Sequence, residues 1–377
     1  MSAAGIIFSN LHEAHITELT KVRTMAAVPF MARYRLVDFP LSNMINSGIT
    51  NVSVITHYNY HSLMNHIGSG KDWDLARRNG GIQILPPFIT AYANNSNSLY
   101  STRLEALCSI NHSISNIKDD FIVLCDCDCI CNIDIKEILE EHEEKKADLT
   151  VVVQKKNVTD EERAKFTIIE ADADGHITDA FTNSGMTSGE KHVSLNIMVI
   201  TRQFMSNMLA DTMAHSYKSF TYDIIGRYKG SRNFRIHEFN GHYSAVDSFV
   251  GYFNQSMKIL RTESIREEIF GNKNRPIFTR IRNSVPTRYK TGCIVRNSFI
   301  ADGCIIEGTV ENSILARNVK IGKNAVVRNS ILFRNTTVGE HAELDYVLSD
   351  KNATIRDGRH LSGCDALPYF IDKGMNL

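Results

Sequence analysis

A short segment near the start of the chain, residues 10–15, carries the side chains whose types and spacing could do chemistry. It reads Asn10, Leu11, His12, Glu13, Ala14 and His15, and it follows an apolar run that predicts a buried strand over residues 6–8. In sheet proteins that bind nucleotides, the turn after the first strand holds the phosphates, and glycines let backbone N–H groups approach them. This turn has no glycine, and Glu13 adds a negative charge where a phosphate chain would lie. We therefore expect a turn filled by side chains, with its phosphate chemistry lost or rebuilt.

Four cysteines alternate along residues 125–131 and suggest a metal site at first sight. They are Cys125, Cys127, Cys129 and Cys131, interleaved with Asp126 and Asp128. Alternate residues on a strand point to the same face, so four thiols in one row do not close a tetrahedron. Zinc sites use pairs of ligands two to four residues apart, with the second pair far away. The pattern favours a buried strand followed by a turn, with no metal.

The elements that would position these residues alternate between strand-like and helix-like stretches up to about residue 255. Buried strands are predicted at residues 6–8, 52–56, 121–125, 148–154 and 196–201. Helices are predicted at residues 41–46, 102–117 and 136–146, and a helical connector at residues 248–268. Such alternation is typical of an α/β sheet that is mostly parallel.

From about residue 292 the pattern changes to a repeat. The segment Asn312-Ser-Ile-Leu-Ala-Arg-Asn-Val-Lys-Ile-Gly is echoed 17 residues later by Asn329-Ser-Ile-Leu-Phe-Arg-Asn-Thr-Thr-Val-Gly, and again from Tyr346. Aliphatic residues recur at about every sixth position, with Gly and Asn between them, which indicates a parallel β-helix of hexapeptide units. Leu315 and Leu332 fall at equivalent places in successive coils, and we expect them to be exposed and to suit a side-by-side contact with another subunit.

Composition narrows the class of protein. The 377 residues include 42 basic and 42 acidic side chains, so no basic surplus indicates nucleic-acid binding. No apolar run approaches the roughly 20 residues that span a membrane, and no signal peptide is recognisable, so we expect a cytoplasmic protein. Three parts are expected: an α/β domain over residues 1–245, a helical connector over 246–290 and the β-helix over 291–377.

Several longer sequence motifs resemble those of bacterial ADP-glucose pyrophosphorylase (glucose-1-phosphate adenylyltransferase). These are Arg33-Tyr-Arg-Leu-Val-Asp-Phe-Pro-Leu-Ser-Asn43, His61-Ser-Leu-Met-Asn-His-Ile-Gly-Ser-Gly70 and Gly80-Gly-Ile-Gln-Ile-Leu-Pro-Pro87. The resemblance covers nearly the whole chain. It implies a nucleotidyltransferase-like, Rossmann-like domain followed by a left-handed parallel β-helix. Active members join glucose 1-phosphate to ATP, with Mg²⁺, and make ADP-glucose for glycogen synthesis.

When the family's functional residues are matched to this sequence one by one, most of them are replaced by other residue types. The glycine-rich phosphate loop and its arginine fall on residues 10–15, and the following lysine falls on Met25. The sugar-phosphate lysine falls near Asn183, and a metal-binding aspartate falls on Ala245, two residues before Asp247. Asp128 matches the remaining acidic position. We therefore predict no bound cofactor for this chain, and at best a remnant of a metal ligand at Asp128.

Arg33 matches a basic residue that binds a small-molecule effector in many members of the family. The sequence motifs associated with the fold are kept, whereas those of the active site are degraded. This combination resembles the divergent, regulatory D-type (GlgD-type) subunit of this family. That implies a catalytic sister chain as partner, in a heterotetramer, and a homo-oligomer in its absence.

Three other interpretations stay open at this point. The chain is an active adenylyltransferase with His12 or His15 as phosphate ligand, a non-enzymatic scaffold protein, or an acyltransferase built on the β-helix. The last is disfavoured because such enzymes need a catalytic histidine on an extended loop, and the repeats carry only His341 and end at His360.

Overall fold

The chain forms two compact units in the computed structural model, which describes residues 1–56, 58–86, 100–159, 166–182 and 189–377. The first unit comprises residues 1–11, 39–243 and 274–278. The second comprises residues 12–38, 244–273 and 279–377.

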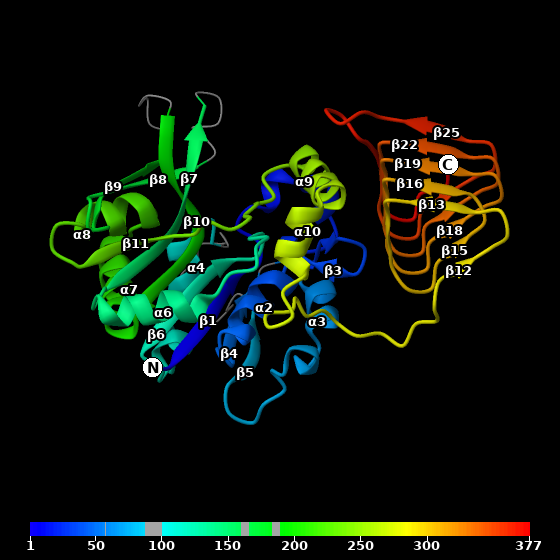
Figure 1. Ribbon diagram of the computed structural model, residues 1–377. Helices are drawn as coiled ribbons and strands as arrows, with labels where there is room; N and C mark the ends of the chain where they lie inside the picture. Colours follow the sequence, from blue (N-terminus) through cyan, green and yellow to red (C-terminus); the bar gives the residue numbers. More distant parts are fainter. Residues whose placement is uncertain (57, 87–99, 160–165, 183–188) are drawn as a thin grey trace. The chain divides into compact units, whose positions relative to one another are not determined.

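A mostly parallel sheet is the centre of the first unit (Figure 1), with strand order β11-β7-β10-β6-β1-β4-β5. Only β10 runs antiparallel to its neighbours β6 and β7 along this path. The strands are β1 Ala3–Phe8, β4 Asn51–Ile55, β5 Gly81–Leu85, β6 Phe121–Asp126, β7 Leu149–Val158, β8 Thr167–Ala171, β9 Ile177–Thr182, β10 Gly189–Thr201 and β11 Phe234–Glu238. The five predicted strands are thereby confirmed.

The helices of this part of the chain pack on the sheet. They are α2 Asp38–Asn46, α3 His61–Ile67, α4 Arg103–Ser109, α5 Asn111–Ser115, α6 Ile135–Glu144, α7 Arg202–His215 and α8 Gly226–Tyr228. Leu104 of α4 and Phe204 of α7 join Ile6 and Ile122 of the sheet in one buried cluster. Burying each such side chain contributes about 1.5–3 kcal/mol. The single helix predicted over residues 102–117 is wrong, because Ile110 (φ −111°, ψ 17°) leaves the helical conformation and separates α4 from α5.

The second unit begins with short elements and then two longer helices. These elements are 3₁₀ turns at Glu13–His15 and Met25–Ala27, α1 Thr17–Thr20, a hairpin of β2 Pro29–Phe30 and β3 Tyr34–Arg35, α9 Phe249–Arg261 and α10 Glu263–Phe270. The predicted connector is therefore helical, but in two pieces. Thr262 has φ −105° and ψ 106°, which ends α9 and starts α10.

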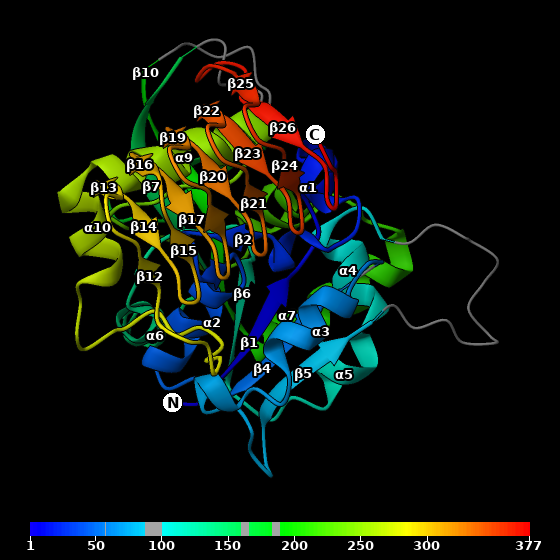
Figure 2. The same cartoon turned by 90° about the vertical axis from the view of Figure 1, so that its right-hand side faces the viewer.

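A β-helix completes the second unit, with three parallel sheets of five short strands each (Figure 2). The first sheet contains β12 Arg288–Tyr289, β15 Ile305–Ile306, β18 Lys320–Ile321, β21 Thr337–Val338 and β24 Thr354–Ile355. The second contains β13 Ile294–Arg296, β16 Thr309–Glu311, β19 Val326–Arg328, β22 Glu343–Asp345 and β25 His360–Ser362. The third contains β14 Phe299–Ile300, β17 Ile314–Leu315, β20 Ile331–Leu332, β23 Val347–Ser349 and β26 Tyr369–Ile371.

The register of these strands confirms the 17-residue repeat. Ile314 pairs with Ile331, and Ile331 pairs with Leu348. At the corners Asn318, Asn335 and Asn352 have φ between 61° and 62°, a conformation that asparagine tolerates better than most residues. Their side chains form a ladder, since Asn318 Nδ2 donates to Asn335 Oδ1 (3.2 Å) and Asn335 Nδ2 donates to Asn352 Oδ1 (2.9 Å).

The expectation that Leu315 and Leu332 are exposed is wrong. Both are 0% exposed and lie in the apolar core of the β-helix. The preceding isoleucines, Ile314 and Ile331, are also buried, at 2% each. A sequence repeat shows which positions are equivalent from coil to coil, but the inside of a coil is decided by where the chain turns.

No helix in the described ranges combines the length and the apolar character that crossing a bilayer requires.

Candidate functional site

The site residues of the first unit gather where β1 and β6 end. The two strands are parallel neighbours, with Phe8 opposite Asp126. The N–H of Cys127 continues the pairing by donating to the carbonyl of Phe8 (3.0 Å). Since parallel strands end at the same edge of a sheet, the loops that follow β1 and β6 leave from the same place. Ligand sites of α/β sheets lie at this edge.

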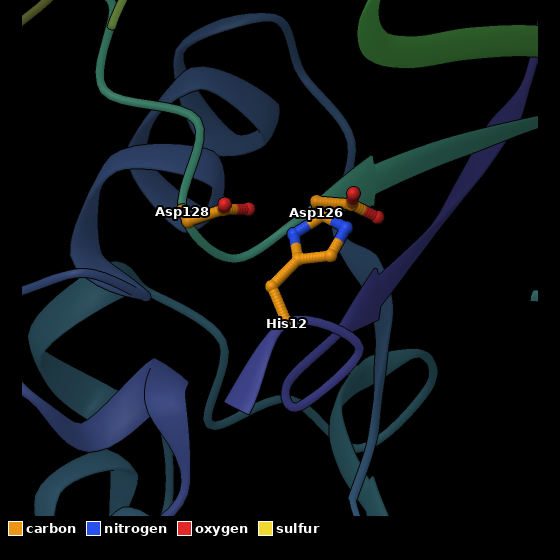
Figure 3. A group of neighbouring side chains, drawn as sticks. All are labelled: His12, Asp126 and Asp128. Carbon is orange, nitrogen blue, oxygen red and sulfur yellow. The ribbon is translucent and has the colours of Figure 1, made fainter. Parts of the chain in front are cut away.

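Two buried carboxylates lie on the β6 side of this edge. Asp126 is the last residue of β6 and Asp128 lies in the loop after it, as Figure 3 shows; the exposed fractions are 1% and 3%. Oxygens of the two carboxylates lie within 4.8 Å of each other. Sequence reasoning selected Asp128 but missed Asp126. Its place at the end of a wholly apolar strand was the available signal.

Asp126 is held by an arginine from the same unit. Nε of Arg103 donates to Oδ1 of Asp126 (3.1 Å), and Nη2 donates to Oδ2. Such a two-pronged pair is among the stronger charge-assisted hydrogen bonds. The carboxylates of Asp126 and Asp128 in turn raise the pKa of Arg103, although burial opposes them. The guanidinium is thus committed to a protein carboxylate, and sequence reasoning did not single it out.

Side chains of the segment around Arg103 accept hydrogen bonds from the backbone N–H groups at the N-terminus of α4. Thr102 caps α4: its Oγ1 accepts from the N–H of Glu105 (3.2 Å), and Oε2 of Glu105 accepts from the N–H of Thr102 (3.2 Å). Glu105 also accepts from the N–H and hydroxyl of Ser101, at 2.8 and 2.9 Å. These amide groups would otherwise be available to an anionic ligand, and a carboxylate of the chain occupies them.

The predicted degenerate loop begins in the first unit and ends in the second. Asn10 accepts through Oδ1 from the hydroxyl of Tyr100 (3.0 Å), and Leu11 packs against the apolar core of the sheet. His12 immediately follows, and its ring stacks on that of His15, with ring centres 6.0 Å apart and planes 3° apart. Ala14 and His15 are exposed. The loop therefore begins with packed side chains and ends in a short 3₁₀ turn that is partly exposed.

Glu13 is the most unusual group of this loop. Its Oε1 accepts from the backbone N–H of Met25 (3.2 Å), the first residue of the second 3₁₀ turn. Burial raises the pKa of the Glu13 carboxyl to about 7, although the Met25 hydrogen bond lowers it. Met25 itself is 0% exposed, so its side chain belongs to the core. A carboxylate and a thioether thus stand where positive charge and open amide groups would be needed for phosphate.

The cysteines near β6 are buried thiols. Strand β6 ends at Asp126, so only Cys125 lies on it, and the other three follow in the turn. The Cys129 thiol donates to the carbonyl of Leu195 (3.2 Å). Hydrogen bonding to Cys129, together with burial, raises the pKa of Cys125 well above its usual range. Burial also raises the pKa of the Cys129 thiol. Thiolate is the reactive and metal-binding form, so Cys125 and Cys129 are chemically quiet near neutral pH.

The second acidic metal ligand that the family resemblance implies is absent from its expected position. Mg²⁺ binds oxygen ligands, usually one or two carboxylates together with phosphates of the substrate. Asp126 is already neutralised by Arg103, and the position predicted for the second acidic ligand is Ala245, which has no side-chain oxygen. Asp247 is exposed, and its Oδ1 accepts from the hydroxyl of Ser248 (3.1 Å) at the start of α9.

Two further predicted positions complete the account. Asn183 lies outside the described residues. Arg33 lies in the second unit, in the turn between β2 and β3, and its Nη2 is 3.5 Å from Oδ2 of Asp302. Its side chain is 49% exposed, and such a pair contributes about 0–1 kcal/mol.

Comparison with known families and proteins gives a consistent result. Residues 14–181 match the family model for nucleotidyl transferase, and residues 283–366 match that for the GlmU-like C-terminal hexapeptide. The chain is 30% identical over 371 residues to the glycogen biosynthesis protein GlgD of Bacillus subtilis, covering 98% of this chain and 96% of the relative. It is 33% identical over 326 residues to GlgD of Geobacillus stearothermophilus, covering 86% and 82%. It is also 32% identical over 365 residues to a glucose-1-phosphate adenylyltransferase of Halalkalibacterium halodurans, covering 96% and 93%.

Proposed function

Because the chain belongs to the family that contains the glucose-1-phosphate adenylyltransferases and the GlgD proteins, we propose that it is a regulatory subunit in glycogen biosynthesis. In this proposal it makes little or no ADP-glucose itself, and it activates a catalytic sister chain. The observation that carries the proposal is the Glu13 carboxylate bonded to the Met25 N–H (3.2 Å), in the segment where the family resemblance places phosphate-binding groups.

The energetics of nucleotidyl transfer support the first half of the proposal. The protein's main task in such a reaction is to position the phosphates and to surround their charge with cations and amide donors. Removing one such donor typically lowers the rate by about 10²–10³. Here His15 and Met25 stand in place of cations, Arg103 is bound to Asp126, and Ala245 cannot bind a metal. Several such losses together leave little basis for turnover.

The second half concerns the partner. Homologous chains can replace one another at closed two-fold interfaces, so a heterotetramer with a catalytic adenylyltransferase is the assembly we propose, with a homo-oligomer when the chain is alone. The first coil of the β-helix offers a suitable surface, since Tyr289 is 56% and Ile294 is 43% exposed. We further propose that the assembly acts in the cytoplasm and that Arg33 contributes to effector binding.

The domain limits also belong to the proposal. A β-helix piece over residues 291–377 is proposed to be the assembly part, residues 246–290 the connector and residues 1–245 the nucleotidyltransferase-like part. Regulation then means that the chain binds one conformational state of its partner more tightly and so shifts the partner's substrate affinity or rate.

The test combines activity and mass. The chain alone is assayed for pyrophosphate release from ATP, glucose 1-phosphate and Mg²⁺, and it is then mixed with the adenylyltransferase of the same organism. We expect background activity for the chain alone, a complex by light scattering at micromolar concentration, and faster or tighter-binding kinetics of the mixture. Ile294→Asp is expected to weaken the complex, whereas Met64→Asp, at a 45% exposed residue of the first unit, serves as control.

The competing interpretations give different results in the same test. Turnover by the chain alone near the median enzyme rate of about 10 s⁻¹ would favour an active adenylyltransferase, in which His12 or His15 binds phosphate. A complex whose kinetics equal those of the partner alone would favour a scaffold.

A further inference from the structure

Two buried carboxylates of the first unit come close to each other at the edge where β6 ends. They belong to Asp126, the last residue of β6, and to Asp128, in the loop that follows (Figure 3). The two residues are 1% and 3% exposed, and an oxygen of one carboxylate lies within 4.8 Å of an oxygen of the other. Two negative charges at this separation, both removed from water, repel each other unless a cation joins them. The first unit supplies a cation beside them, the guanidinium of Arg103.

Two nitrogens of Arg103 bind one of these carboxylates. Nε donates to Oδ1 of Asp126 (3.1 Å), and Nη2 donates to Oδ2. The side chain of Arg103 is 18% exposed and that of Asp126 is 2% exposed, so water competes little for either group. Burial alone would lower the pKa of Arg103, but the negative charges of Asp126 and then of Asp128 raise it above its usual range. Both carboxylates therefore attract the same guanidinium.

The place of Arg103 in its helix is not explained by helix formation. Arg103 is the first residue of α4 and directly follows the capping residue Thr102. The N-terminus of a helix carries a partial positive charge, so carboxylates are favoured there and cations are disfavoured. Glu105, in the same turn, follows this preference and completes the capping box. Arg103 opposes it, so the attraction of the two carboxylates accounts for an arginine at this position.

A divalent cation would meet the same electrostatic requirement. Mg²⁺ and Mn²⁺ prefer oxygen ligands, and proteins commonly bind them through one or two carboxylates. Asp126 and Asp128 offer such oxygens, but both oxygens of Asp126 already accept hydrogen bonds from Arg103. A metal ion bound to Asp126 would lie beside a permanent positive charge, because arginine does not lose its proton in proteins. The guanidinium and a metal ion are therefore alternative partners of this carboxylate.

We propose that Arg103 replaces a divalent cation in this chain. Its guanidinium neutralises Asp126 and Asp128 as a metal ion would, and it keeps this edge of the sheet folded without one. Two consequences follow: the unmodified chain does not bind a divalent cation at these carboxylates, and removing the guanidinium creates a site that does. The proposal does not rest on the regulatory role, since both consequences are measured on the chain alone and hold whether or not it activates a partner.

The test measures Mn²⁺ binding by the full-length chain, from the decrease of the electron paramagnetic resonance signal of the free ion, with Mg²⁺ as competitor. Arg103→Met removes the guanidinium, and Arg103→Lys keeps a positive charge. The double variant Arg103→Met, Asp128→Asn also removes the second carboxylate. Arg23→Met is the matched control, because it deprives the buried carboxylate of Asp350 of its arginine in the second unit, where the two side chains are 2% and 4% exposed.

We expect no saturable Mn²⁺ binding by the unmodified chain, by Arg103→Lys or by Arg23→Met up to about 1 mM, the limit of weak affinity. Arg103→Met should bind Mn²⁺ at least about tenfold more tightly than this limit, and Mg²⁺ should displace the ion. Adding Asp128→Asn should weaken this binding by about tenfold or more, because a ligand is lost.

The melting temperature gives a second readout of the same idea. Without metal, Arg103→Met should melt below the unmodified chain, because two buried carboxylates lose their cation. Mn²⁺ should raise the melting temperature of Arg103→Met, since a ligand of the native state stabilises it. The melting temperatures of the unmodified chain and of Arg23→Met should not change with Mn²⁺. An arginine with a merely structural role would give a loss of stability that Mn²⁺ does not restore.

Three results would overturn the proposal. One is saturable Mn²⁺ binding by the unmodified chain that Asp128→Asn abolishes, because the metal ion and the guanidinium would then share the carboxylates. Another is a folded Arg103→Met that binds no Mn²⁺ below about 1 mM. The third is an equal rise of the melting temperature of Arg23→Met with Mn²⁺, which would make the response common to any unpaired buried carboxylate. If Arg103→Met does not fold, Arg103→Gln, whose uncharged amide can donate to Asp126, is measured in its place.

Discussion

Replacing Arg23 by methionine should destabilise the second unit strongly, because Arg23 forms a buried ion pair with Asp350. Nη2 of Arg23 is 2.8 Å from both carboxylate oxygens of Asp350, which is 327 residues away in the chain. The side chains are 2% and 4% exposed. Nη1 of Arg23 also donates to the carbonyl of Leu19 (3.1 Å). The pair therefore ties the segment before β2 to the fourth coil of the β-helix.

The magnitude follows from the burial of the pair. Removing one partner of a buried ion pair leaves a charge in a medium that solvates it poorly, which typically costs about 3–5 kcal/mol. Arg23→Met should lower the free energy of unfolding by about this amount. The double variant Arg23→Met, Asp350→Asn removes both charges and keeps an acceptor for the N–H of Lys351, which lies 2.6 Å from Oδ1 of Asp350. The double variant should recover at least about 2 kcal/mol of the free energy of unfolding lost in Arg23→Met, because replacing both members of a buried ion pair by uncharged residues often changes stability little.

Urea unfolding followed by far-UV circular dichroism measures the change. The chain has a single tryptophan, Trp73, which is 1% exposed and lies in the first unit. Its fluorescence therefore reports on the other unit, and its midpoint should move less than that of circular dichroism. Lys21→Met is the control: Lys21 pairs with Asp372 at 3.1 Å, but the side chains are 58% and 56% exposed. It should change stability by less than about 1 kcal/mol.

A stability loss of less than about 1 kcal/mol for Arg23→Met, the range of exposed ion pairs, would contradict the assigned role of the buried pair. A double variant whose loss of stability equals the sum of the losses of the two single variants would also contradict that role, because the two charges would then act independently.

Three other predictions concern the loop and the β-helix. Because the folded-state pKa of Glu13 is raised from 4.5 to about 7, the native chain binds more protons than the unfolded chain between these values, so its contribution to stability falls as pH rises through this window; the melting temperature of the unmodified chain minus that of Glu13→Gln should decrease from pH 5 to pH 8, and a constant difference would contradict the assignment. Restoring a single cation, by His15→Arg or Met25→Lys, should leave ADP-glucose formation at background in a pyrophosphate-release assay, because groups that act as a unit are not additive; clear activity from either variant would show that the loop backbone already fits a triphosphate. Leu332→Ala, at a 0% exposed position of the β-helix core, should cost about 2–5 kcal/mol by thermal or urea unfolding, whereas Leu367→Ala, at a 72% exposed position, should stay within about 0.5 kcal/mol; equal effects would mean that the two side chains are equally buried.

The order of the helices and strands, and the repeat of the β-helix, could be predicted from periodic patterns of apolar residues in the sequence. A strand places alternate residues on opposite faces and a coil of the β-helix repeats after a fixed number of residues, so periodicity in the sequence predicts both element type and register. The pairing of Ile314 with Ile331 was therefore predictable from the repeat alone. The break at Ile110 was not, because no glycine or proline marks it.

What only the tertiary structure decided is which side chains meet. Asp126 and Arg103 lie 23 residues apart and Arg23 and Asp350 lie 327 apart, and no spacing rule connects either pair. Sequence alone also placed Leu332 on the surface, since it shows which positions are equivalent but not on which side of the coil they lie. The loss of phosphate-binding residue types at residues 10–15 was plain from the sequence, because it depends on residue chemistry. The Glu13–Met25 contact depends on how two separate turns of the folded chain approach one another, and only the structure contains that information.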